Sequence, residues 1–154
     1  MMIKLLVVFY FAIIINITFA QNDQFHIKSV ATNEFLQAPV GPEAPLTLGN
    51  SNTAGTWTID PPPDPNRVVV STIYDQQADL YASVNQAAQG DEIIAVSDSY
   101  EFNIARTPEG SYVIFPIGPG LFWASNSTIS PHIELIFGND IKGNDGFFDI
   151  IPVV

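Results

Sequence analysis

Trp57-Thr58-Ile59, Phe102-Asn103-Ile104 and Phe148-Asp149-Ile150 decide the fold of this chain. Each triplet reads aromatic residue, polar residue, isoleucine, and successive copies begin 45 and 46 residues apart. Near-constant spacing in this range is typical of a fold built from equivalent supersecondary units. The triplets therefore predict three structural repeats, which we place at about residues 24–60, 66–106 and 110–152.

Short alternating or apolar runs fill each repeat, separated by Gly, Pro, Asn and Asp, and none has a convincing helical period. This pattern predicts an all-β domain. Four strands per repeat give twelve, expected at 25–30, 34–38, 45–48, 55–60, 67–73, 80–84, 92–96, 100–106, 112–115, 121–125, 132–137 and 146–151. Because side chains alternate between strand faces, both apolar positions of each triplet are expected in one core: Trp57, Ile59, Phe102, Ile104, Phe148 and Ile150.

Twelve strands in three four-stranded repeats resemble the β-trefoil, in which six strands form a barrel and six form a hairpin cap. The resemblance implies a single domain over residues 21–154. The proline run at 61–65 is then a stiff loop between the first two repeats, since the fragments on either side are too small to fold alone.

The first twenty residues have the layout of a secretory signal peptide. Lys4 supplies a positive charge, residues 5–15 are an unbroken apolar run, and small residues precede Gln21 at positions 18 and 20. A membrane anchor is the alternative, but it needs about 20 apolar residues, and this run is shorter. We expect cleavage after Ala20, a secreted protein, and no membrane attachment afterwards.

The expected mature chain is strongly acidic. It carries four basic residues against sixteen acidic ones, a net charge of −12 with neutral histidines. Such a surface repels phosphates, so we expect neither nucleic acid nor anionic membrane as a partner. A basic partner and simple solubility are both compatible with this charge.

Residue types also limit the chemistry and the modifications available to the chain. It has no cysteine, which excludes disulfides, zinc–thiolate sites and cysteine nucleophiles, so stability must come from packing. Asn126-Ser127-Thr128 is a glycosylation sequon, which makes Asn126 a candidate for modification in a secretory pathway.

Residues suited to catalysis are scattered, which favours a protein that is not an enzyme. His26 and His132 fall in predicted strands, and no motif supplies a nucleophile and an orienting partner. Asp91-Glu92 is an acidic pair in a turn, and the polar segment 138–146 lacks the ligand pattern of a calcium loop. We therefore expect no cofactor and no metal ion.

Carbohydrate binding is one of two binding functions to weigh. Ricin-type lectins carry Gln-x-Trp at the end of each repeat, but Gly55, Tyr100 and Gly146 stand at the glutamine position here. Aromatic faces suit the C–H surface of a sugar, although aromatic residues more often pack in a core or cap. The aromatic residues expected on the surface are Tyr74, Phe122 and Trp123.

A second pattern joins the triplets to four further stretches: 34–36, 43–46, 100–104 and Pro131-His132-Ile133-Glu134-Leu135-Ile136. It resembles the small β-trefoil serine protease inhibitors of mushrooms, the cospin and cnispin type, and more remotely the mycocypin cysteine protease inhibitors. The resemblance implies a monomer that binds an extracellular protease through a rigid surface loop. A glycan is the alternative partner.

The resemblance places an inhibitory loop at residues 37–45, between the second and third strands. Three prolines stiffen this loop, and rigidity lowers the ordering cost of binding. An ordinary Pro-rich turn is the alternative interpretation. The loop lacks the Lys or Arg that trypsin-like proteases favour, so we add Lys142, with Arg67, Asn139 and Asn144 as weaker alternatives. The candidate residues within the loop are Pro39, Val40, Gly41, Pro42 and Glu43.

Overall fold

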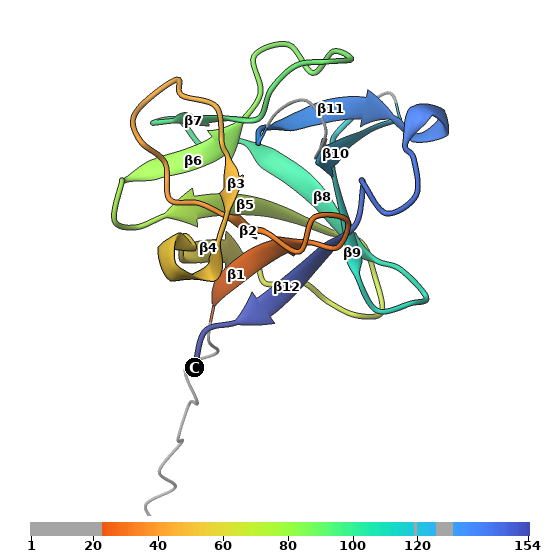
Figure 1. Ribbon diagram of the computed structural model, residues 1–154, viewed down its shortest axis with the longest axis horizontal. Coiled ribbons are helices and arrows are strands. Elements are labelled where there is room, and N and C mark those ends of the chain that lie inside the picture. Colours follow the sequence, from red (N-terminus) through yellow and green to blue (C-terminus); the bar gives the residue numbers. More distant parts are fainter. Residues whose placement is uncertain (1–22, 119, 126–130) are drawn as a thin grey trace, which may run out of the picture.

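The computed structural model describes residues 23–118, 120–125 and 131–154, and its ordered elements are strands, as expected (Figure 1). Two short 3-10 turns, Ser51–Thr53 and Gly138–Asp140, are the only helical segments within these ranges. None of the described helical segments is long and apolar enough to cross a membrane. The strands are β1 (Gln24–Ser29), β2 (Phe35–Leu36), β3 (Leu48–Gly49), β4 (Trp57–Asp60), β5 (Val69–Asp75), β6 (Leu80–Ser83), β7 (Ile94–Val96), β8 (Glu101–Arg106), β9 (Tyr112–Pro116), β10 (Leu121–Ser125), β11 (Ile133–Phe137) and β12 (Phe148–Pro152).

Six strands close into a ring in which every neighbouring pair is antiparallel. β1 pairs with β12, β12 with β9, and β9 with β8. β8 then pairs with β5, β5 with β4, and β4 returns to β1. Closure of this ring gives each of its six strands a partner on both sides, which removes exposed strand edges.

The remaining six strands form three hairpins, β2–β3, β6–β7 and β10–β11. Isolated bridges link these hairpins in pairs, from Pro45 to Ile94, from Thr47 to His132, and from Glu92 to Glu134. Each repeat therefore contributes one hairpin to a shared triangular layer, and that layer ties the three repeats together.

The triplet side chains lie where the three repeats meet. Trp57, Phe102 and Phe148 are all 0% exposed. The isoleucines of the first two triplets, Ile59 and Ile104, are equally buried, whereas Ile150 is partly buried and packs against the same cluster. The aromatic residue in each repeat is thus a core residue, which explains why the triplet recurs.

Trp123 also belongs to the core, so the expectation that it lies on the surface was wrong. Its ring stands edge-to-face against Phe102 at 5.1 Å and against Phe148 at 6.1 Å between ring centroids. Register explains this position. Trp123 pairs with the buried Leu135 on β11, while its neighbour Phe122 points to the other face of β10 and stays half-buried.

The third strand of the first repeat is shorter than expected. β3 covers only Leu48–Gly49, whereas Pro45 and Thr47 form isolated bridges instead of a continuous ladder. Pro45 has no N–H to donate, so it cannot extend the ladder with its neighbours. The third strand of the second repeat is also shortened, to Ile94–Val96.

One turn position repeats in all three units and was not noticed in the sequence. In each repeat, the residue two positions before the aromatic residue of the second strand has a positive φ. The values are 63° at Asn33, 58° at Asp79 and 58° at Gly120. Gly adopts this left-handed conformation freely, and Asn and Asp tolerate it. The turn places the aromatic residues Phe35, Tyr81 and Phe122 over the preceding strand, against Lys28, Tyr74 and Phe115 respectively.

Candidate functional site

The segment 37–45 connects β2 to β3 and is fixed at its far end by the second repeat. The N–H of Glu43 donates to the carbonyl oxygen of Ala95 at 2.6 Å, and the N–H of Ala95 donates to the carbonyl oxygen of Ala44 at 3.0 Å. Ala95 is 0% exposed and lies in β7. The loop is therefore attached to the core of a neighbouring repeat as well as to its own strands.

Val40 is the most exposed apolar side chain of this loop, at 89%. Pro39 precedes it, Pro42 follows two residues later, and a side-chain carbon at Gly41 would meet no atom within 4 Å. The tip therefore projects freely, while Glu43, at φ 59°, ends the loop where the hydrogen bonds to β7 begin. An apolar side chain in this position buries little surface on folding, so it adds little to stability, and its exposed surface is available to a partner.

The other sequence-predicted site residues are not brought to this loop. Lys142 is exposed in the segment between Gly138–Asp140 and β12, drawn in blue on the right of Figure 1, whereas the β2–β3 loop is at the upper left. Arg67 forms an ion pair with Asp64 at 2.9 Å, at the end of the proline run. Asn126 and the expected signal peptide lie outside the described residues.

The two histidines have structural partners and do not converge. His26 donates from Nδ1 to the carbonyl oxygen of Gly55 at 2.8 Å, and its ring meets Phe35 edge-on at 6.1 Å. His132 places Nδ1 2.5 Å from a carboxylate oxygen of Glu92, linking two hairpins of the triangular layer. Within the described ranges, no three His, Cys, Asp or Glu side chains cluster as metal ligands.

Tyr74 and Tyr81 form a half-exposed aromatic pair on the β5–β6 hairpin. Their ring centroids are 4.6 Å apart, and the Tyr74 hydroxyl donates to Oδ1 of Asp79 at 2.7 Å. This hydrogen bond, more than burial or the nearby negative charge, raises the pKa of Tyr74 above its ordinary value of 10.0. The pair presents aromatic surface, but neither ring lines one of the described pockets.

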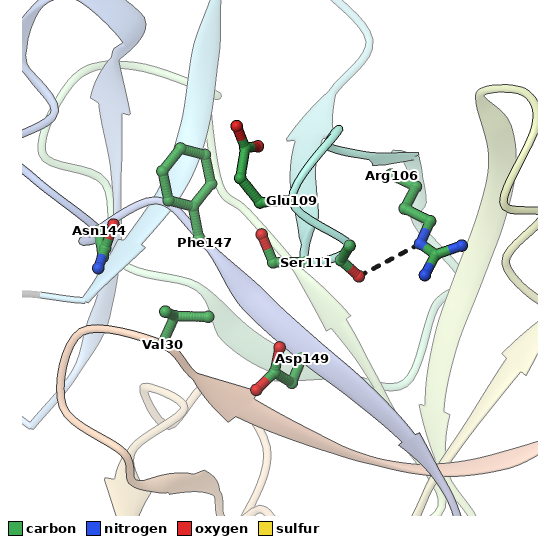
Figure 2. Close-up of a pocket in the computed structure, with 8 residues that line it drawn as sticks. Val30, Arg106, Glu109, Ser111, Asn144, Phe147 and Asp149 are labelled. Atoms are coloured by element: carbon green, nitrogen blue, oxygen red, sulfur yellow. Dashed lines mark hydrogen bonds between the residues drawn. The ribbon is translucent and has the colours of Figure 1, made fainter.

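A pocket of about 720 Å³ opens beside the hairpin that joins β8 to β9 (Figure 2). Its volume lies within the roughly 300–1,000 Å³ that is usual for small-molecule sites. Parts of the first and third repeats and the end of the second contribute to it. The lining residues are Val30, Arg106, Glu109, Gly110, Ser111, Asn144, Phe147 and Asp149.

The hairpin wall of this pocket is held by its own hydrogen bonds. The N–H of Thr107 donates to the carbonyl oxygen of Ser111 at 2.8 Å, and the N–H of Gly110 donates to the carbonyl oxygen of Thr107 at 3.0 Å. Gly110 has a φ of 99°, which favours glycine. Arg106 donates from Nε to the carbonyl oxygen of Gly110 at 3.3 Å, drawn as a dashed line in Figure 2.

The opposite wall is equally well connected. The N–H of Phe147 donates to the carbonyl oxygen of Asn144 at 3.0 Å. The N–H of Val30 donates to the carbonyl oxygen of Phe147 at 2.9 Å. Asp149 projects outward from β12 between the core residue Phe148 and Ile150. Of the pocket residues, only Asn144 was named from the sequence as a site candidate, and Asp149 was noted only as part of the third triplet.

The sequence matches no family model and no curated protein. Solved structures do resemble the chain. The ricin B-like lectin of Macrolepiota procera, determined in complex with lactose, has a TM-score of 0.68 at 14% identity, covering 87% of this chain and 98% of its own. The Rhizoctonia solani agglutinin has a TM-score of 0.69 at 10% identity, covering 86% and 96%.

A designed threefold-symmetric protein, ThreeFoil, is similar over 85% of this chain and 99% of its own, with a TM-score of 0.67 at 10% identity. The chain is a β-trefoil. Identities this low show the fold alone. The functional site must therefore be argued from the residues of this trefoil and not from its neighbours.

Proposed function

We propose that this trefoil is a secreted inhibitor of an extracellular serine endopeptidase, that it acts through the loop at residues 39–43, and that it has no catalytic activity of its own. The observation that carries the proposal is the placement of Val40. Its side chain is 89% exposed between two prolines, on a loop whose end is hydrogen-bonded to a buried strand of another repeat.

Rigidity is what turns such a loop into an inhibitor. A segment that already holds its bound conformation avoids most of the ordering cost that a flexible substrate pays on binding. Pro39 and Pro42 restrict the backbone at the tip, and the Glu43–Ala95 hydrogen bond fixes its exit. The loop therefore meets the main physical requirement for tight, substrate-like binding.

The tip residue also selects the class of protease. Val40 is small and aliphatic, whereas a trypsin-like primary pocket holds a carboxylate that requires Lys or Arg. Elastase-type enzymes have a small primary pocket, which a valine side chain fits. We therefore expect a target that cleaves after small aliphatic residues. The exposed Lys142 is the alternative for a trypsin-like target.

The test is an inhibition panel run with the chain from Gln21 onward against elastase, subtilisin, trypsin, chymotrypsin, papain and legumain. We expect micromolar or tighter inhibition of elastase or subtilisin. Val40→Asp should weaken it by about 100-fold or more, because an unpaired carboxylate would be buried in the enzyme pocket. Ile117→Asp is the matched control, since Ile117 is an exposed apolar residue, at 62%, outside the loop. No inhibition of any panel member at micromolar concentration would overturn the proposal.

Carbohydrate binding is the second candidate function. It is supported by the likeness to a lectin determined in complex with lactose and by the pocket of Figure 2, whose lining combines a phenyl ring with carboxylate and amide groups. The two functions are compatible, because in Figure 1 the β8–β9 hairpin lies at the lower right, away from the β2–β3 loop. Glycan-array binding without protease inhibition would favour this second function over the first.

A further inference from the structure

We propose that the pocket between the β8–β9 hairpin and β12 is a single binding site for a neutral saccharide. This inference rests on the second candidate function and is independent of the loop at Val40. It is carried by three features of the pocket in Figure 2: walls that are already ordered, polar side chains without partners in the described part of the chain, and an aromatic ring among them.

The walls need no rearrangement to receive a ligand. Hydrogen bonds of 2.8 and 3.0 Å close the hairpin around Gly110, and bonds of 2.9 and 3.0 Å fix Phe147 between Val30 and Asn144. Backbone that is held on both sides of an open pocket loses little conformational entropy when a ligand enters.

Three polar side chains in the pocket are uncommitted. The carboxylates of Glu109 and Asp149 and the amide of Asn144 take part in no hydrogen bond or ion pair within the described part of the chain. Carboxylates accept hydrogen bonds from hydroxyl groups, and an amide both donates and accepts. Together they match a ligand that presents several neighbouring hydroxyls.

Phe147 adds apolar surface beside these groups. Its ring stands between Asn144 and Glu109 in Figure 2, with Val30 below it. A pyranose has hydroxyls around its edge and a C–H face, so it pairs with a site that combines hydrogen-bonding groups and a phenyl ring.

Charge favours a neutral sugar over an acidic one. Two carboxylates line the pocket against one guanidinium, that of Arg106, and the Nε of Arg106 is engaged by Gly110. The chain from Gln21 onward carries a net charge of −12, which repels anionic ligands as they approach. We therefore expect sialylated and sulfated glycans to bind more weakly than their neutral counterparts.

The site has no copy at the other junction between repeats that the structure describes. The connection from β4 to β5 is equivalent to the connection from β8 to β9. The first contains the proline run 61–65, whereas the second contains the hairpin 107–111. Four prolines and Val69 line the surface there without a side-chain hydrogen-bonding group, and its two charged side chains, Asp64 and Arg67, are paired with each other at 2.9 Å. The trefoil is accordingly expected to bind one glycan per chain, so a monomer would not cross-link cells.

The experiment is a glycan array probed with the chain from Gln21 onward, followed by NMR titration of the isotope-labelled protein with lactose and with sialyllactose. We expect binding to neutral glycans on the array, and lactose-dependent shifts confined to the amides of Gly110, Ser111, Phe147 and Asp149. Sialyllactose should bind at least about tenfold more weakly, and Asp149→Asn and Glu109→Gln should each weaken lactose binding by about tenfold.

Val40→Asp is the matched control and should bind lactose as the unmodified protein does. Phe147→Leu keeps an apolar side chain at the half-buried position and should weaken sugar binding without changing the thermal transition. The proposal is overturned if no neutral glycan binds, or if the pocket variants bind as the unmodified protein does. Either outcome leaves protease inhibition through Val40 untouched, so the two proposals fail separately.

Discussion

The N–H of Glu43 donates a 2.6 Å hydrogen bond to the carbonyl oxygen of Ala95, which lies in a buried strand of the next repeat. This bond joins a surface loop of the first repeat to the core of the second. Glu43 has a φ of 59°, a conformation that ordinary side chains adopt only at a cost. The contact ties the end of the loop to β7, and such anchoring favours the preorganised conformation that the proposed inhibition needs.

Glu43→Pro tests that contact directly. Proline has no N–H and fixes φ near −65°, so both the hydrogen bond to Ala95 and the turn are lost. We expect inhibition to weaken by about tenfold or more, as the freed loop pays an ordering cost on binding. The free energy of unfolding, measured in urea, should fall by only about 1–2 kcal/mol.

Glu43→Asn is the control for that change. Asparagine keeps the N–H and tolerates a positive φ, while it removes the carboxylate. This variant should inhibit as well as the unmodified protein. If Glu43→Pro inhibits equally well, the anchoring of the loop has no part in binding.

Trp123→Ala should be among the most destabilising single changes in the chain. Its ring is 0% exposed and bridges Phe102 and Phe148, so truncation leaves a cavity between two repeats. We expect a loss of about 3–5 kcal/mol in the free energy of unfolding. Phe122→Ala, one residue earlier on the outer face of β10, should cost about 1 kcal/mol because that ring is only half-buried. Equal losses in chemical denaturation would contradict the register of β10.

Gly55→Ala should destabilise the fold although it adds one methyl group. A side-chain carbon at Gly55 would lie 2.8 Å from the backbone nitrogen of Ala38 and 2.7 Å from Nε1 of Trp57. Neither atom can move without disturbing the backbone or the buried core, so we expect the free energy of unfolding to fall by about 1–3 kcal/mol. Gly41→Ala, which meets open space, should leave the thermal transition unchanged. The same crowding explains why no glutamine stands here, two residues before Trp57.

The raised pKa of Tyr74 gives a prediction at alkaline pH. A raised folded-state pKa favours the protonated phenol, so this stabilising contribution is present below pH 10 and is lost as pH rises past the folded-state pKa. Asp79→Asn removes the carboxylate that accepts the phenol's hydrogen bond and keeps a residue that tolerates φ 58°. In an ultraviolet titration of phenolate, Tyr74 should ionise at a lower pH in this variant, and an unchanged curve would contradict the assignment.

Much of the fold follows from the sequence because its determinants are local and repeated. The triplets led by Trp57, Phe102 and Phe148 mark equivalent core positions, and alternation along the strands identifies most inward side chains. Trp123 was misplaced because it neighbours another aromatic residue, and only the pairing of β10 with β11 decides which of the two points inward. The turn residues Asn33 and Asp79 carried a detectable signal, since they stand at equal distances before Phe35 and Tyr81.

The candidate sites were less accessible to sequence reasoning. The loop at residues 39–43 was predicted from its prolines and from a resemblance to trefoil protease inhibitors. The exposure of Val40 and the bond from Glu43 to Ala95 in another repeat are visible only in the structure. The pocket joins Val30, near the start of the described chain, to Asp149, near its end. Contacts between residues so far apart in the sequence depend on closure of the strand ring, which no local sequence pattern predicts.

The proposed inhibition requires that Val40 enters the primary pocket of a serine protease. It is tested most directly by the inhibition constants of the unmodified chain and of Val40→Lys against elastase and trypsin, measured side by side. We predict that the lysine variant loses elastase inhibition and gains trypsin inhibition, each by about 100-fold or more, since a trypsin pocket pairs with a lysine side chain that a small apolar pocket excludes. Unchanged inhibition of both enzymes by Val40→Lys would contradict the claim.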